Sequence, residues 1–311
     1  MEQDIILKNL EYLGQKYCQR HLSEWNPEIL ENNWWEGLKF FLNHSFMRGR
    51  KDELSNAYYY FTLEVLAEIY INKSRSIEEA YERLFSDKIY FNKNIILELK
   101  KQNKIGKKSF QQDAGLRALV LMKNPLVEPM ISPRKIKFEW NKRTFERQVH
   151  LGNDTDILMV LDVLRFITSE SQQKNIYKFI KDMLKDQKAS DAYNLLKGSH
   201  LYGISDKIAS FIIRDILLLN PMIDIKGDDL KMAFPVDTWV RKLSHRLGFP
   251  GDNTDEIRNY FINLCCKEGI NAPKMAAGMW YLGFHSLDVL IDNCLDNFEF
   301  QSRCKKQLSG D

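Results

Sequence analysis

The spacing of apolar residues is the feature of this chain that most restricts its fold. Apolar side chains recur every three or four residues along most of the sequence, as in Ile157, Val160, Leu161 and Leu164. This spacing places them on one face of a helix, whereas the strict alternation that is typical of strands is scarce. We therefore predict an all-α protein.

Several separate segments share this helical spacing. The predicted helices cover residues 3–22, 33–46, 53–72, 76–85, 92–103, 109–123, 155–169, 171–187, 190–198, 206–220, 237–248, 254–268, 272–283 and 286–297. The stretch 124–140 contains three of the eight prolines and separates two helical blocks, which indicates a loop or a boundary between lobes.

Composition narrows the class of protein. Of the 311 residues, 44% are hydrophobic and 28% are charged, which favours a large folded core over disorder. The 45 basic and 42 acidic residues leave a net charge of only +3, so net charge alone does not predict nucleic-acid binding. The five cysteines contain no C-x-x-C pair, which argues against a zinc site and a disulfide framework and favours reduced, mostly buried thiols.

Neither the N-terminal residues nor the longest apolar stretch predicts a membrane protein. The first residues carry acids where a signal peptide would carry bases, and Arg214, Asp215 and Pro221 interrupt the longest apolar stretch, residues 208–225. We expect a cytoplasmic protein, associated with the nucleoid if the source is prokaryotic.

A very short turn joins two of the predicted helices. One helical pattern ends at Gly198, and Ser205 has the side chain of an N-cap for the next. Gly203 can take a positive φ in the turn, while Leu201 and Ile204 are spaced to hold it against both helices. Such a joint can present backbone amides to a DNA phosphate, although the same pattern is equally compatible with a purely structural role.

Two motifs resemble those of a known family. Residues 201–209, LYGISDKIA, resemble the hairpin of the HhH-GPD (helix-hairpin-helix) superfamily of base-excision DNA glycosylases, and residues 234–240, FPVDTWV, resemble its proline-valine-aspartate segment. Residues 241–248, RKLSHRLG, look like the family's continuation of the aspartate helix. The later MWYLG, residues 279–283, is most similar to the archaeal 8-oxoguanine glycosylase branch.

The resemblance implies a two-lobed helical fold with an active-site cleft between the lobes. On this basis residues 1–75 and 249–311 form an outer lobe, and residues 76–248 form a central lobe. The helix-hairpin-helix is expected at about 190–220, and the catalytic aspartate segment at 234–248.

Asp237 is the first predicted catalytic residue. Removal of a base from DNA builds positive charge on the deoxyribose, and a carboxylate held against the sugar would stabilise it. Asp237 follows Pro235 at the start of a helix, where the helix dipole favours the ionised acid. The alternative is that Asp237 only caps its helix or pairs with Arg241.

Lys207 is the second predicted catalytic residue. A lysine amine can attack the sugar, displace the base and form a Schiff base that permits strand cleavage. The positive end of the helix dipole and burial in a cleft would both favour the neutral, nucleophilic amine. In the family, a lysine here marks enzymes that combine glycosylase and lyase activity; the alternative is an ordinary lysine that contacts phosphate.

Two departures from the family concern the phosphate site. Gly203 and Ser205 are the predicted phosphate-binding residues, but Ser205 stands where the family usually has the second glycine of the hairpin. The 30 residues from Lys207 to Asp237 also exceed the usual separation. A serine N-cap can still expose backbone amides, so these departures bear on phosphate binding more than on catalysis.

Three aromatic residues are candidates for a pocket that holds a flipped base. Phe211 lies one helical turn after Lys207 and Trp280 matches a late tryptophan of the archaeal branch, where two such rings sandwich the oxidised guanine. Phe46 stands near the position of a base-contacting residue in an earlier segment. Ordinary core packing is the alternative for each.

The expected partner is double-stranded DNA that contains a damaged base, and the expected activity is glycosylase and AP lyase, most readily on 8-oxoguanine. Basic clusters are candidates for phosphate contacts, or else are solvated faces: Arg48 and Arg50; Lys101, Lys104, Lys107 and Lys108; Arg134, Lys135 and Lys137. We expect a monomer with no cofactor, no iron-sulfur cluster and no metal. The alternatives are a glycosylase for alkylated bases or oxidised pyrimidines, and a non-catalytic DNA-binding protein.

Overall fold

The computed structural model describes residues 2–47, 52–91, 125–140, 143–169, 174–197, 201–249 and 251–286. Most of these residues are helical, as the apolar spacing predicted. The predicted helices 92–103 and 109–123, and all but the first residue of 286–297, lie outside the described residues. No helix in the described ranges is both long and apolar enough to cross a membrane.

The chain divides into two compact units. We call Met1–Glu24 with Lys226–Asp311 the terminal unit, and Trp25–Ile225 the inserted unit. The expected lobes also joined both chain ends, but with boundaries at residues 75 and 248. The observed division falls earlier at both places, because α1 packs on α15 while the following helices pack among themselves.

The terminal unit contains four α-helices among its described residues, with a π-helical turn at Cys18–Leu22 and a 3-10 helix at Gly227–Ala233. The α-helices are α1 (Glu2–Tyr17), α13 (Thr238–Arg246), α14 (Thr254–Glu268) and α15 (Ala272–Phe284). Two glycines bring α1 and α15 together: a Cβ at Gly278 would lie 1.7 Å from the carbonyl oxygen of Leu10, and one at Gly14 would lie 1.9 Å from that of Lys274.

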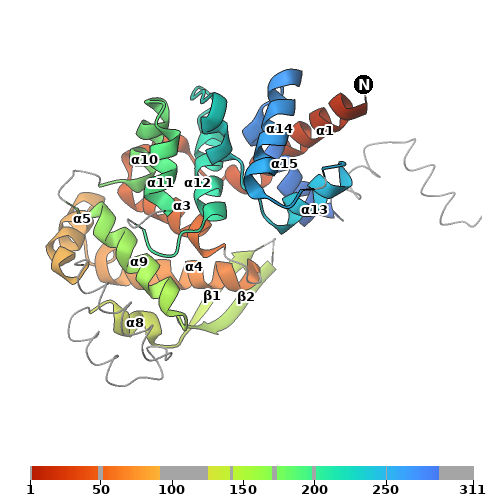
Figure 1. The fold of residues 1–311 in the computed structure, drawn as a ribbon. Coiled ribbons are helices and arrows are strands. Elements are labelled where there is room, and N and C mark those ends of the chain that lie inside the picture. The colour runs from red at the N-terminus through yellow and green to blue at the C-terminus, as the bar shows by residue number, and fades with distance from the viewer. Residues whose placement is uncertain are drawn as a thin grey trace, which may run out of the picture. The chain divides into compact units, whose positions relative to one another are not determined.

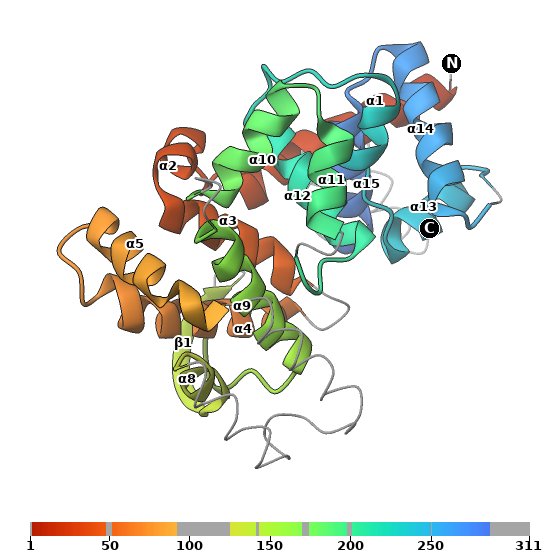
Figure 2. The ribbon, with the colours of Figure 1, turned by 60° about the vertical axis from the view of Figure 1, so that its left-hand side comes forward.

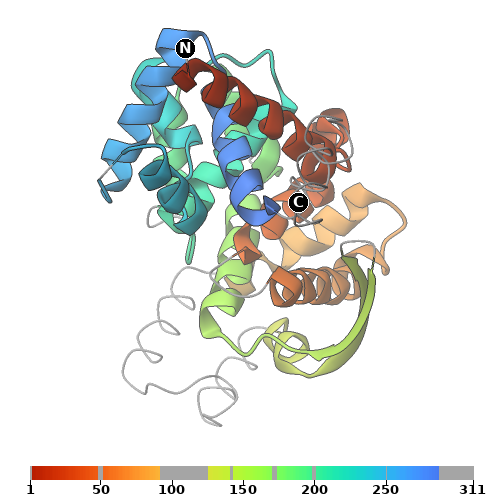
Figure 3. The same cartoon turned by 90° about the vertical axis from the view of Figure 1, so that its right-hand side faces the viewer.

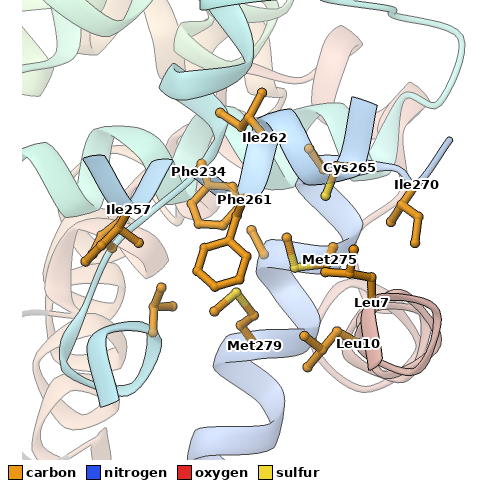
Figure 4. Packing of buried hydrophobic residues seen from close by; sticks show 14 residues of the cluster. Leu7, Leu10, Phe234, Ile257, Phe261, Ile262, Cys265, Ile270, Met275 and Met279 are labelled. Carbon is orange, nitrogen blue, oxygen red and sulfur yellow. The ribbon is translucent and has the colours of Figure 1, made fainter. Parts of the chain in front are cut away.

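Apolar side chains from the four α-helices and from the segment around the 3-10 helix form one core in the terminal unit (Figure 4). Phe234 and Phe261 stack in its centre with ring centroids 6.1 Å apart, and Leu7 of α1 and Met275 of α15 close one side. The segment that leads into the predicted catalytic aspartate is therefore anchored by its phenylalanine.

The inserted unit is built from the remaining helices and one hairpin of strands. Its α-helices are α2 (Pro27–Asn32), α3 (Trp34–Phe46), α4 (Asp52–Leu66), α5 (Ile77–Ser86), α8 (Val127–Ile131), α9 (Asp154–Ile167), α10 (Ile176–Lys185), α11 (Ala189–Lys197) and α12 (Asp206–Leu219). A π-helical turn at Ala67–Ile71 extends α4, and a 3-10 helix at Asp87–Phe91 follows α5. Helices α10, α11 and α12 pack in succession (Figures 1 and 2).

Most helices begin where the sequence places a short polar side chain. In each case its oxygen accepts a backbone N–H of the first turn, which satisfies a donor that the helix itself leaves open. The capping residues are Asn26, Asn33, Ser76, Asn153, Asn175, Ser205, Asp237, Asn253 and Asn271.

The hairpin is the exception to the helical prediction. Strands β1 (Arg134–Trp140) and β2 (Arg143–Val149) pair antiparallel, with Phe138 opposite Phe145. Ile136 and Phe138 are buried, and β1 packs along α4 (Figure 3). The alternation of Ile136, Phe138 and Trp140 with charged residues is a strand pattern, but it is short and follows prolines, which instead favour a loop or a boundary between lobes.

Candidate active site

The turn between α11 and α12 has the conformation that its sequence predicts. Gly203 has φ +76°, a left-handed conformation that glycine adopts without strain. Leu201 and Ile204 are buried on either side of it, as predicted. Residues 198–200, which begin the turn, lie outside the described residues.

A residue that sequence reasoning missed holds this turn in place. The buried carboxylate of Asp162, on α9, accepts the backbone N–H of Tyr202 at 2.7 Å and the Arg165 Nε–H at 2.7 Å. Tyr193 of α11 also donates its hydroxyl to Asp206 at the start of α12. The hairpin is therefore fixed by two carboxylates. The signal available in the sequence was an aspartate within the apolar face of a predicted helix.

Ser205 and Lys207 lie at the start of α12. Ser205 is exposed and caps the helix, with its Oγ 3.4 Å from the backbone nitrogen of Ile208. Lys207 is half-buried, and its Nζ lies 6.0 Å from the centroid of the Phe211 ring. Among the described residues of the inserted unit, no carboxylate pairs with Lys207. The residue thus keeps part of its surface in solvent, and its amine has no anionic partner among those residues.

Phe211 contacts a second cation of its own helix. The Arg214 guanidinium lies 4.5 Å from the ring centroid, within the range of a cation–π interaction, and the guanidinium is fully buried. Phe211 itself is half-buried. The structure thus brings Gly203, Ser205, Lys207 and Phe211 together at one end of α12.

A buried network of charged side chains links α12 to α3. Asp215 is fully buried and accepts hydrogen bonds from Arg214 Nε at 2.7 Å and from His44 Nε2 of α3 at 2.8 Å. The other His44 nitrogen lies 2.8 Å from the Phe40 carbonyl oxygen. Burial alone would raise the pKa of Asp215, but the Arg214 charge and the bonds from His44 and Arg214 outweigh it and lower that pKa to about 2.

The other predicted catalytic residue, Asp237, follows a buried segment of the terminal unit. Pro235 and Val236 are buried, and the buried Arg258 of α14 donates Nε–H to the Phe234 carbonyl at 2.9 Å. Asp237 Oδ1 accepts the backbone N–H groups of Trp239 and Val240, both at 2.9 Å, and so caps α13.

The alternative role of Asp237 was to cap its helix or to pair with Arg241, and the structure shows the cap but not the pair. The carboxylate caps its helix, but Arg241 bonds instead to the backbone oxygen of Asp252 and to the Thr254 hydroxyl. Asp237 is half-buried, and its Oδ2 has no hydrogen bond to any described residue of the terminal unit. One carboxylate oxygen therefore fixes the side chain while the other remains open to a ligand.

Lys207 and Asp237 belong to different units, since Lys207 lies in the inserted unit and Asp237 in the terminal unit. Their action on a single nucleotide stays a prediction.

The other two predicted pocket residues have different surroundings. Trp280 is half-buried and stacks on Phe284 with centroids 4.8 Å apart and an interplanar angle of 9°. Its edges meet Tyr17 and His21 of the same unit. Phe46 is fully buried in the inserted unit, 6.5 Å from the Tyr58 ring. A base could not reach Phe46 without rearrangement of this core, so we leave it out of the proposed pocket.

The predicted basic clusters are only partly described. Arg134 pairs with Glu68 and Lys135 pairs with Glu146, so both charges are compensated, whereas Lys137 is exposed. Arg48, Arg50 and the cluster at 101–108 lie outside the described residues.

The cysteines in the described ranges differ in exposure and are not part of a metal site there. Cys265 is buried, which raises the pKa of its thiol to about 12, while Cys266 is exposed and Cys18 half-buried. Cys294 and Cys304 lie outside the described ranges. No group of three or more His, Cys, Asp or Glu side chains within these ranges is arranged to hold a metal ion.

Comparison of this chain with models of protein families, with curated proteins and with solved structures finds no match.

Proposed function

We propose that this protein is a DNA base-excision glycosylase with AP lyase activity, in which Lys207 is the nucleophile and Asp237 the electrostatic partner. The proposal rests on the two motifs and on the surroundings of their side chains. The observation that carries it is the half-buried Lys207 at the start of α12, which follows directly after a tight hairpin whose Gly203 has a positive φ.

The hairpin supports binding of a DNA backbone next to Lys207. Backbone N–H groups at a helix N-terminus attract phosphate, and Ser205 is exposed at this end of α12. A phosphate held here would place the sugar of a neighbouring nucleotide within reach of the lysine side chain. Phosphate contacts of this kind set the register of a protein on DNA.

Lys207 supplies the covalent step. The lone pair of its neutral amine attacks C1′ of the sugar, and the electrons of the C1′–N bond leave with the base, which takes up a proton from solvent. Opening of the sugar ring then gives a Schiff base between C1′ and Nζ. Loss of a proton from C2′ breaks the C3′–O bond and cleaves the strand.

Asp237 supplies the negative charge that this chemistry needs. Positive charge develops on the sugar as the base departs, and a fixed carboxylate stabilises it without reorganisation. The two capping hydrogen bonds hold Oδ1 in place, so that Oδ2 can face the sugar. The proposal requires both side chains to act on one nucleotide, which the variants below test.

The damaged base is the least constrained part of the proposal. Phe211 is the predicted pocket residue that lies beside Lys207, and it offers a half-buried ring for stacking. We propose 8-oxoguanine as the first substrate to test because the motifs most resemble the archaeal 8-oxoguanine branch. Oxidised pyrimidines and alkylated purines are the comparison substrates.

Borohydride trapping tests the nucleophile, because reduction of the Schiff base joins enzyme and DNA permanently. We expect a covalent complex with duplex DNA that contains 8-oxoguanine or an abasic site. Lys207→Gln should abolish it, and Lys185→Gln, an exposed lysine of α10, should not. A complex that survives in Lys207→Gln would overturn the role of Lys207. No complex on either DNA would overturn the lyase and leave a DNA-binding protein.

Two substitutions at Asp237 separate catalysis from helix capping. Asparagine still caps a helix, so Asp237→Asn should leave the free energy of unfolding within about 0.5 kcal/mol of the wild type. The same variant should lower base excision at least about 100-fold. Asp237→Ala should lower excision similarly and also destabilise the protein by about 1 kcal/mol. An active Asp237→Asn enzyme would limit Asp237 to its capping role.

A further inference from the structure

A series of aromatic rings runs along one face of the β1–β2 hairpin. Tyr60 of α4 stacks on Phe138 with centroids 5.6 Å apart, and Phe138 stacks on Phe145 across the strands at 5.5 Å. Phe145 in turn lies 6.0 Å from Trp140 near the end of β1. Each pair is close enough for aromatic contact.

The rings become more exposed away from the centre of the series. Phe138 is only 4% exposed and belongs to the core, whereas Tyr60 is 37% exposed. Phe145 and Trp140 are half-buried. Core packing accounts for Phe138, but it leaves surface of Tyr60, Phe145 and Trp140 in water. These rings can therefore accept a further flat group.

A cation stands beside the exposed end of the series. Arg143 is the cross-strand partner of Trp140, so both side chains lie on the same face of the hairpin. Arg143 is exposed, and no carboxylate in the described ranges pairs with it. The other two arginines of this face are compensated, since Arg134 pairs with Glu68 and Arg147 with Glu53.

The charge of the hairpin favours a negatively charged partner. Of the five basic side chains on its two strands, Arg134, Lys135 and Arg147 pair with carboxylates, whereas the exposed Lys137 and Arg143 have no such pair in the described ranges. An anionic polymer with flat groups at regular intervals matches rings beside an arginine, because bases stack on the rings while phosphate pairs with the guanidinium.

We propose that Tyr60, Trp140, Phe145 and Arg143 form a stacking site for unpaired bases of a DNA strand. This site rests on the proposed function, which makes DNA the partner, and adds a contact outside the α11–α12 hairpin. Single-stranded DNA binds such surfaces with little sequence preference, since every base has a flat face.

Equilibrium binding of a labelled oligothymidine to the full chain tests the site. Phe145→Leu and Trp140→Leu keep apolar bulk but remove the flat rings, and each should weaken binding about tenfold. Trp35→Leu is the matched control, because Trp35 is a half-buried tryptophan of α3. Arg143→Gln should reduce the slope of log K against log salt by about 0.7, whereas Arg75→Gln, at another exposed arginine, should not.

Two comparisons make the result decisive. Inorganic polyphosphate has the charge of DNA without bases, so ring removal should leave its binding unchanged. Thermal unfolding of each variant excludes loss of the fold as the cause. Equal oligothymidine binding by the ring variants and by Trp35→Leu would overturn the site, and so would an equal loss of polyphosphate binding.

The outcome is separable from the proposed catalysis. Borohydride trapping depends on Lys207, whereas the stacking site is measured by equilibrium binding. Trapping with unchanged binding by the ring variants would refute the stacking site alone. Weaker binding by the ring variants without trapping would refute the enzyme alone.

Discussion

The side chains of His44, Arg214 and Asp215 form a buried polar network within the core of the inserted unit. Arg214 and Asp215 interrupt the long apolar stretch of α12, and the sequence alone indicated only that this stretch does not cross a membrane. Their partner His44 is 171 residues away, so no local pattern could identify it. A buried charge is stable only when it is paired, which makes this network sensitive to removal of one member.

The pH dependence of stability should report on Asp215. Its pKa is lowered to about 2 in the folded protein from its ordinary value of 3.8. A lowered pKa of an acid stabilises the folded state above the unfolded pKa, and this stabilisation is lost as the pH falls through the folded pKa. We expect a loss of about 2 kcal/mol between pH 4 and pH 2 from this group alone.

Urea unfolding at a series of pH values measures this loss. Asp215→Asn should already be destabilised by about 3–5 kcal/mol at pH 7, because Arg214 would remain buried without its carboxylate. The variant should also lack the part of the acid dependence that belongs to this group. Identical acid profiles for both proteins would show that Asp215 is not the source.

At the scale of elements, the hairpin between α11 and α12 depends on a contact from α9. Asp162 accepts the Tyr202 N–H and thereby fixes the turn whose glycine has a positive φ. Asp162→Ala should leave this donor unsatisfied and cost about 1–3 kcal/mol. Asp162→Asn retains an acceptor oxygen and should cost less.

Hydrogen exchange locates this effect. The Tyr202 amide should exchange faster in Asp162→Ala than in the wild type, and the amides of α14, in the other unit, should change less. If all amides exchange faster by the same factor, Asp162 supports global stability rather than the turn.

Helices and local motifs were predictable from the sequence because their determinants lie within a few residues of one another. The caps Ser205 and Asp237 and the turn at Gly203 were identified from neighbouring residues. The strand hairpin was not, because seven-residue strands give a weak signal beside a proline-rich stretch. Asp162 was missed because its partner is distant in sequence. The burial of Phe46 follows from packing that periodicity does not reveal.

Along the whole chain, the sequence of one unit is inserted between the two segments of the other. The terminal unit is discontinuous in sequence, and its core requires Leu7 and Leu10 from α1 together with residues of α14 and α15. The inserted unit is one continuous segment with its own buried core. These arrangements predict different behaviour for fragments.

A fragment of residues 25–225 should unfold cooperatively when expressed alone. Residues 226–311 should remain largely unfolded, because removal of α1 exposes the apolar surface of α15. Addition of a peptide of residues 1–24 to this fragment should restore its helical circular dichroism. The same peptide should not restore it in a 226–311 fragment with Gly278→Leu, because a side chain at 278 meets the Leu10 carbonyl. A 226–311 fragment that folds without the peptide would contradict this dependence.

The close contact between α1 and α15 also sets an order of events during synthesis. Helix α1 leaves the ribosome before α15, which follows only after the 201 residues of the inserted unit and much of the terminal unit's second segment. At cellular elongation rates this delay is roughly 13–50 s. During that time the apolar face of α1 has no native partner, so we expect α1 to be a chaperone-binding segment of the nascent chain until α15 emerges.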